Sequence, residues 1–241
     1  MRKRCLSNWL LSAVALASGA VCAQSHSSPG HVAELRLRVN ASQAGKHRIV
    51  PAVIWLEPVA GTRALPFLPD RHYTLLQKNR TFIPHLQIVP VGAVVQFPNA
   101  DPFFHNVFSL FDGKRFDLGL YEAGSSKSVT FSRAGVSYIF CDIHPEMSAV
   151  VLALSTPLYE IADADDSFVL HDVPTGDYNI HIWVEGVPQP LLDGLTQLAH
   201  LQEQKVDLGT LSVPTTPGGM GDHLDKFGNT YDPHSKSPYE P

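Results

Sequence analysis

The feature that most constrains the fold is a series of short segments in which apolar and polar residues alternate. In residues 33–39 every second side chain is apolar, and residues 178–184 follow the same period of two. Successive side chains of a strand point to opposite faces, so this period predicts half-buried strands. Clusters of Pro, Gly, Asn and Asp separate the segments and predict turns. We therefore predict an all-β fold, with a loop over residues 116–126 and further strands at 50–56, 86–90, 93–97, 128–131, 135–140, 148–154, 168–170 and 208–213.

A cysteine, a histidine and a methionine fall within seven residues between two of these expected strands. They are Cys141, His144 and Met147, and Pro145 stiffens the connection between them. A tight loop there can bring the three side chains to one point. His105, 36 residues upstream, would reach the same point from another strand. One soft thiolate, two imidazoles and one thioether form the donor set of a mononuclear blue-copper site.

Each of these residues also has an ordinary structural interpretation. Cys141 could be a buried thiol, Met147 a core methionine and His144 an exposed loop residue. Two histidines and one cysteine could also bind zinc, but a methionine as the fourth donor favours copper. His85 could be an extra ligand, although an exposed strand histidine explains it better. We expect copper, with His105, Cys141, His144 and Met147 as its ligands.

The pattern His105 followed by Cys141-x-x-His144-x-x-Met147 resembles the signature of the cupredoxin family, and residues 141–147 are similar to the short ligand loop of amicyanin. Residues 82–107 also resemble the strand pair before the first ligand of plastocyanin-like proteins. The resemblance implies a cupredoxin-like Greek-key β-sandwich with one type 1 copper ion. It further implies that His144 reaches the surface as the electron port. Asn106 would then tie the two ligand-bearing segments together through hydrogen bonds, or else be a plain turn residue.

The wider chain, over roughly residues 31–190, is similar to periplasmic proteins labelled "methylamine utilisation protein". These proteins follow the cupredoxin unit with a pattern that runs here from Asp163 to Tyr178. The flanking strands resemble a transthyretin-like or carboxypeptidase-regulatory-like sandwich. We expect a cupredoxin-like domain over 70–156 and a second, split β-sandwich over 31–68 together with 157–213. One elongated β domain with extra strands is the alternative.

The two ends of the chain carry separate signals. Residues 1–23 combine three basic residues, a short apolar run and a small-residue cleavage site, which predicts a signal peptide and a periplasmic location. A lipidated Cys22 is an alternative. The chain has a formal net charge of −5, and removal of residues 1–23 would take away three basic residues and no acid. The acidic remainder disfavours nucleic-acid binding, and no other apolar stretch predicts a membrane span. Residues 214–241 contain few apolar side chains and predict a disordered tail.

These observations favour an exported copper protein that carries single electrons. The family label suggests a redox partner such as a quinoprotein dehydrogenase or a cytochrome. A copper storage or delivery protein, or a β-sandwich binding module with a stabilising metal, are the alternatives. We do not expect an enzyme, because the histidine pairs that a second copper site needs do not occur in the sequence.

Overall fold

The structure is a computed structural model of the 241-residue chain, and it describes residues 32–40, 50–69, 71–110, 113–202, 204–213 and 224–230. The predicted signal peptide, residues 1–23, lies outside the described residues. Within the described part, no helix is long and apolar enough to cross a membrane.

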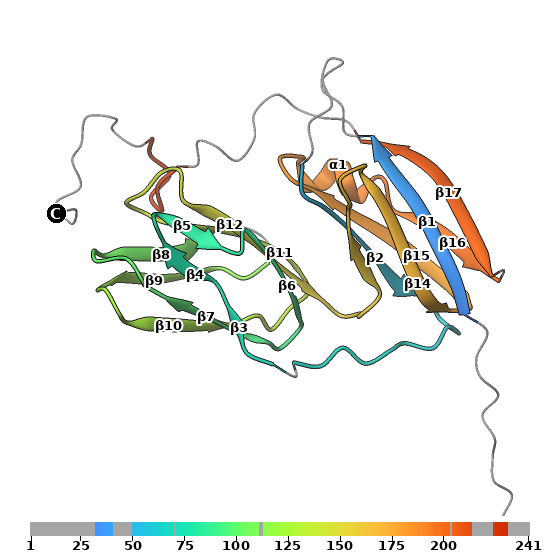
Figure 1. Ribbon diagram of the computed structural model, residues 1–241, viewed down its shortest axis with the longest axis horizontal. Helices are drawn as coiled ribbons and strands as arrows, with labels where there is room; N and C mark the ends of the chain where they lie inside the picture. Colours follow the sequence, from blue (N-terminus) through green and yellow to red (C-terminus); the bar gives the residue numbers. More distant parts are fainter. Residues whose placement is uncertain are drawn as a thin grey trace, which may run out of the picture. The chain divides into compact units, whose positions relative to one another are not determined.

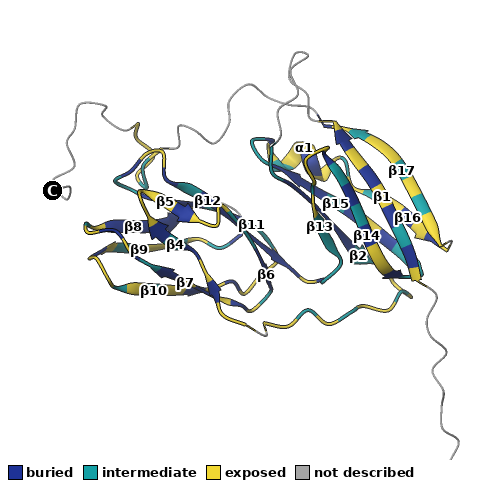
Figure 2. Cartoon of the chain, viewed as in Figure 1, coloured by how far each residue is buried: buried dark blue, intermediate teal, exposed yellow. Residues whose placement is uncertain are grey.

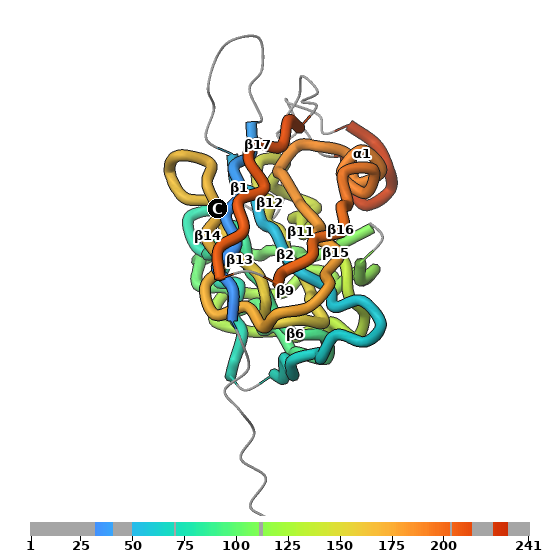
Figure 3. The backbone as a smooth tube through the Cα atoms, turned by 90° about the vertical axis from the view of Figure 1, so that its right-hand side faces the viewer, coloured from blue at the N-terminus to red at the C-terminus, as the bar shows by residue number. Residues whose placement is uncertain are grey.

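Two sheets are built from the strands at either end of the described chain (Figure 1). One has the order β14-β1-β17, and Figure 3 shows β17 running beside β1, to which it is parallel. The other has the order β13-β2-β15-β16, with the short helix α1 after β15. The bounds of these elements are β1 (Val32–Asn40), β2 (Ala52–Pro58), β13 (Tyr159–Ile161), β14 (Ser167–Pro174), β15 (Gly176–Val184), α1 (Gln189–Asp193), β16 (Gln197–Leu201) and β17 (Lys205–Ser212).

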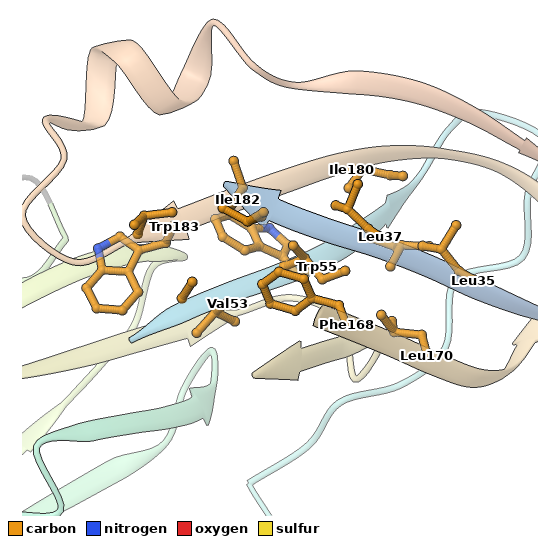
Figure 4. Packing of buried hydrophobic residues seen from close by; sticks show 14 of the residues in the cluster. Leu35, Leu37, Val53, Trp55, Phe168, Leu170, Ile180, Ile182 and Trp183 are labelled. Atoms are coloured by element: carbon orange, nitrogen blue, oxygen red, sulfur yellow. The ribbon is translucent and has the colours of Figure 1, made fainter. Parts of the chain in front are cut away.

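The alternating residues of β1 explain how these two sheets pack. Leu35 and Leu37 are buried, whereas Arg36 and Arg38 are exposed, so the strand shows alternating colours in Figure 2. Each fully buried leucine contributes about 1.5–3 kcal/mol of hydrophobic stabilisation. Figure 4 shows the side chains that share this core, and they come from β1, β2, β14 and β15: Leu35, Leu37, Val53, Trp55, Phe168, Leu170, Ile180, Ile182 and Trp183.

The strands between β2 and β13 form two further sheets and one hairpin. The five-stranded sheet has the order β6-β12-β11-β8-β9, the three-stranded sheet has the order β10-β7-β3, and β4 pairs with β5. Their bounds are β3 (Tyr73–Thr74), β4 (Leu76–Lys78), β5 (Thr81–Ile83), β6 (Leu86–Pro90), β7 (Val94–Pro98), β8 (His105–Ser109), β9 (Phe116–Tyr121), β10 (Ser126–Thr130), β11 (Gly135–Phe140) and β12 (Ser148–Leu154).

A second apolar core lies between these sheets. It is built from inward-facing residues such as Val95 and Phe97 of β7, Val107 of β8 and Val151 of β12. Cys141 and Met147 belong to the same buried cluster. The predicted metal ligands therefore lie at the margin of a packed apolar interior.

The all-β fold class predicted from the sequence is confirmed, since α1 is the one α-helix among the described residues. The loop expected over residues 116–126 is wrong in its first half, where β9 pairs with β8. Gly119 had favoured a loop, but its positive φ of 65° accommodates a bulge inside the strand pair. The two-domain boundaries stay a prediction.

Part of the predicted disordered tail departs from that prediction. Residues 224–230 form a turn, and Lys226 donates from its backbone to Asp142 next to Cys141. The low apolar content of the tail predicts no hydrophobic core, but it says nothing about polar contacts of this kind. The rest of the stretch 214–241 lies outside the described residues.

Candidate metal centre

The segment Cys141–Met147, here called the ligand segment, connects two paired strands of the five-stranded sheet. It begins directly after β11 ends at Phe140 and finishes directly before β12 starts at Ser148. The Cys141 N–H donates to the Met147 carbonyl at 3.1 Å, and the Met147 N–H donates to the His144 carbonyl at 3.0 Å. These two bonds close the segment into a compact turn, which holds its three predicted ligands on one framework.

Cys141 lies at the centre of the site. Its side chain is fully buried, and its sulfur accepts the backbone N–H groups of Ile143, Asn106 and His144. Burial raises the pKa of the thiol to about 11, even though these three N–H groups act in the opposite direction. Without a metal, the thiol therefore keeps its proton at neutral pH. A bound cation would favour the thiolate, which already has three hydrogen-bond donors in place.

His105, the first residue of β8, faces Cys141 from the neighbouring strand. Its Nδ1 lies 3.7 Å from the Cys141 sulfur, and its Nε2 lies 2.8 Å from Asp101 Oδ2. Burial lowers the pKa of His105 in spite of the nearby Asp101 carboxylate, so the ring is neutral at pH 7. The carboxylate can only accept, so the proton belongs on Nε2. The lone pair of Nδ1 then points toward the sulfur, as metal ligation requires.

Asp101 is itself fixed by the hairpin of β4 and β5. Its carboxylate accepts the backbone N–H of Asn79 at 2.6 Å and that of Arg80 at 3.0 Å. Both turn residues have a φ of 55°, as a two-residue hairpin turn requires, and this conformation directs both N–H groups to one side. Burial alone would raise the pKa of Asp101, but the donors Arg80, His105 and Asn79 outweigh it and lower that pKa.

His144 approaches the same sulfur from within the ligand segment. Its Nδ1 lies 3.4 Å from the Cys141 sulfur, and the two imidazole centroids are 4.7 Å apart. Phe103 contacts both rings, with centroid distances of 5.3 Å to His105 and 5.6 Å to His144. We expected His144 to reach the surface. That expectation is wrong, because the residue is only 5% exposed and its ring Nε2 is buried.

The three donors fit a single metal ion. Nδ1 of His105, Nδ1 of His144 and the sulfur of Cys141 define the one group of three metal-ligating side chains found among the described residues, with all donor atoms within 4.8 Å of one another. Bonds of about 2.0–2.3 Å to one ion would separate a sulfur and a nitrogen by roughly 3.5–3.8 Å. The observed separation of 3.7 Å for His105 lies within that range, and the 3.4 Å for His144 lies about 0.1 Å below it.

Met147 ends the ligand segment, and its role as a ligand stays a prediction. The residue is fully buried in the same apolar cluster as Cys141, and it closes the ligand segment through both backbone hydrogen bonds. A thioether in this place suits the weak axial position of a copper site.

Asn106 links the two ligand-bearing segments through its backbone, whereas its side chain contacts Asp117. Its backbone N–H donates to the Cys141 sulfur, whereas its side-chain Nδ2 donates to Asp117 Oδ1 at 2.7 Å. The bulge at Gly119 brings Asp117 into reach, and the Gly119 N–H binds the same carboxylate oxygen at 2.8 Å. Sequence reasoning missed Asp117 because its segment read as a loop.

His85 does not join the metal-ligating group. It is exposed, and its ring contacts Glu185 at 2.6 Å and the Ser148 carbonyl at 3.2 Å. The hydrogen bond with Glu185 raises the pKa of His85. His85 is therefore exposed, as expected, but it lies in the connection between β5 and β6 and not in a strand.

These features define a class of protein: an all-β chain with a buried group of two imidazoles and one thiol that could hold a metal ion. No family model matches the chain, and no curated protein matches it. The resemblance to the methylamine utilisation family therefore stays a prediction.

Among solved structures the chain is similar to a purple cupredoxin from Nitrosopumilus maritimus, with 24% identity, a TM-score of 0.31, and coverage of 35% of this chain and 100% of that one. An amicyanin from Paracoccus versutus gives 21% identity, a TM-score of 0.32, and coverage of 36% and 85%. A copper-containing nitrite reductase from Thermus scotoductus gives 27%, 0.33, and coverage of 41% and 25%. All three TM-scores lie below 0.5, so the donor atoms of the site itself carry the functional conclusion.

Proposed function

We propose that this protein binds one type 1 copper ion and carries single electrons. His105, Cys141 and His144 would supply the three strong donors, and Met147 the weak fourth one. The observation that carries the proposal is the convergence of two imidazole nitrogens on one buried sulfur. When bound, copper supplies a one-electron change between its two oxidation states.

The donor set supports copper over zinc. Structural zinc sites use four strong ligands, usually cysteine and histidine, whereas one thiolate, two imidazoles and a thioether suit copper. A type 1 site is useful for electron transfer because its ligands move little when the charge of the metal changes. Here the closed ligand segment, the Asp101 bond to His105 and the burial of Cys141 all restrict such movement.

The surface near the site offers one route for electrons. His144 is buried, at 5% exposure, whereas Phe104, the residue before His105, is 40% exposed. An exposed aromatic side chain this close in the chain to a predicted ligand suits contact with a transient redox partner, because aromatic residues are enriched in protein interfaces. A quinoprotein dehydrogenase or a cytochrome remains the proposed class of partner, and export by the segment 1–23 remains part of the proposal.

Copper storage or delivery is the competing function, and the burial of the donors argues against it. Delivery requires that an acceptor reach the metal ligands, yet Cys141 and His105 have no exposed surface. A purely structural metal site would not need the thioether of Met147, which suits copper. We also propose that the protein is not an enzyme; the one group of ligating side chains found among the described residues offers its donors to a single ion.

The experiment loads the protein with copper and cycles it between chemical reductant and oxidant in the presence of a copper chelator. An electron carrier keeps its copper through many cycles and recovers its visible spectrum each time. Transfer of the metal to the chelator upon reduction would instead establish delivery. A Cys141→Ser variant is the control, because it should hold copper too weakly to cycle.

A further inference from the structure

The segment 224–230, far from the site in sequence, folds into its own small turn. The Asp225 carboxylate accepts the backbone N–H groups of Phe227 and Asn229 at 2.9 and 2.7 Å, and the Asp225 N–H donates to the Asn229 carbonyl at 2.9 Å. Such a carboxylate-capped turn is a locally determined structure. It fixes the direction in which Lys226 projects.

Lys226 reaches two carboxylates, one on β9 and one in the ligand segment. Its backbone N–H donates to Asp142 Oδ1 at 3.0 Å, and its Nζ lies 3.0 Å from Asp117 Oδ2 and 3.5 Å from Asp142 Oδ2. The side chain of Asp142 is only 17% exposed, and that of Lys226 only 24%. Partial burial reduces the screening of these contacts by solvent.

Each of the two carboxylates either adjoins a predicted metal ligand in the chain or is hydrogen-bonded to a residue that does. Asp142 directly follows Cys141 in the chain. Asp117 binds the side chain of Asn106, which directly follows His105 and donates its backbone N–H to the Cys141 sulfur. Lys226 therefore joins the segment that carries His105 to the segment that carries Cys141.

We propose that Lys226 is a positioning residue of the metal centre, supplied by the C-terminal part of the chain. It holds the two ligand-bearing segments together and offsets two negative charges beside the site. The part of this proposal that concerns copper rests on the proposed function. The part that concerns the two segments applies to the metal-free protein as well.

Two consequences follow from removal of the Lys226 charge. The segments lose a common partner, so the ligands are held less firmly and bound copper should dissociate faster. We expect the copper dissociation rate to increase about three- to tenfold. Loss of a residue that hydrogen-bonds a ligand directly changes metal affinity by about 10- to 100-fold. Lys226 contacts neighbours of the ligands and not the ligands themselves, so its effect should be smaller. The two carboxylates also become uncompensated. Negative charge favours the more positive, oxidised state of the site, so the reduction potential should shift downward.

The test compares Lys226→Gln and Lys226→Arg with a matched control, Lys205→Gln, in the full chain. Lys205 is an exposed lysine at the start of β17. Amide hydrogen exchange of residues 105–107 and 141–147 is measured first in the metal-free protein. Copper dissociation and the reduction potential are then measured in the loaded protein.

The proposal predicts faster exchange in both segments for Lys226→Gln, restoration by Lys226→Arg and no change for the control. Faster copper loss and a lower potential should accompany the exchange result. Exchange in Lys226→Gln that equals exchange in Lys205→Gln would overturn the proposal. Failure of the wild-type chain to bind copper would instead overturn the proposed function, and the metal-free exchange experiment would still decide the role of Lys226 in linking the two segments.

Discussion

Replacement of Asp101 by Asn should weaken metal binding without changing any predicted ligand. The carboxylate uses Oδ1 for the Asn79 N–H and Oδ2 for both the Arg80 N–H and His105 Nε2. An amide offers one oxygen for these three donors, so at least one of them loses its acceptor. If the amide nitrogen faces His105, the imidazole must place its proton on Nδ1, which removes the lone pair that the metal needs.

The size of this effect can be worked from the lost contacts. Hydrogen bonds to a charged group contribute about 1.5–3 kcal/mol each, so the metal-free variant should lose roughly 2 kcal/mol of folding stability. The copper dissociation constant should rise about 10- to 100-fold, or roughly 1.4–2.7 kcal/mol. Competition against a copper chelator measures the affinity, and denaturant unfolding of the metal-free protein measures the stability.

Asp163→Asn is the matched control for this variant. The Asp163 Oδ1 also accepts two backbone N–H groups, those of Asp165 and Ser167, at 2.9 and 2.8 Å, but Asp163 contacts no predicted ligand. It should lose some stability and keep its copper affinity. Equal copper affinity in Asp101→Asn and in the wild type would refute the reasoning that Asp101 sets the protonation of His105.

Three further predictions concern the sulfur donors. Copper binding near pH 7 should release about one proton, since the pKa of Cys141 is about 11 without metal and the bound sulfur is a thiolate; calorimetry in buffers of different ionisation enthalpy counts it, and zero release would contradict thiolate ligation. An unfolded thiol loses its proton near pH 9 and the folded one near 11, so between these values the folded metal-free protein holds more protons. Its stability should therefore fall as the pH rises, by up to about 3 kcal/mol, relative to Cys141→Ser, and parallel pH profiles of the two proteins would argue against a raised pKa. Met147→Leu should keep the copper–thiolate absorption and raise the reduction potential, because a weak donor to the oxidised metal is lost; an unchanged potential by voltammetry would remove Met147 from the site.

The sequence predicted the core of the candidate site because its residues are local. Cys141, His144 and Met147 share one turn between paired strands, so their spacing alone suggests convergence. The role of His105 was harder to predict, because His105 lies far from Cys141 in the sequence. Its prediction depended on the expectation that another strand carries it to the same point. Strand alternation likewise predicted most of the strands, since burial on one face of a sheet leaves a period of two.

The contacts around the ligands could not be read from the sequence. Asp117 reaches Asn106 because a bulge at Gly119 shifts the register between β8 and β9, and no local pattern predicts such a shift. Lys226 lies 84 residues after Asp142 in a segment of low apolar content. Its contacts are polar and distant in sequence, so hydrophobic periodicity gives no sign of them.

The most direct test of the central claim is the visible absorption of the copper-loaded protein, measured together with its copper content. If two imidazoles and the thiolate of Cys141 bind one ion, the oxidised protein should hold one copper and show a strong band near roughly 600 nm. The band should be absent from Cys141→Ser. A colourless oxidised protein that has nevertheless bound one copper would contradict the claim, because the metal would then lack a bond to the sulfur.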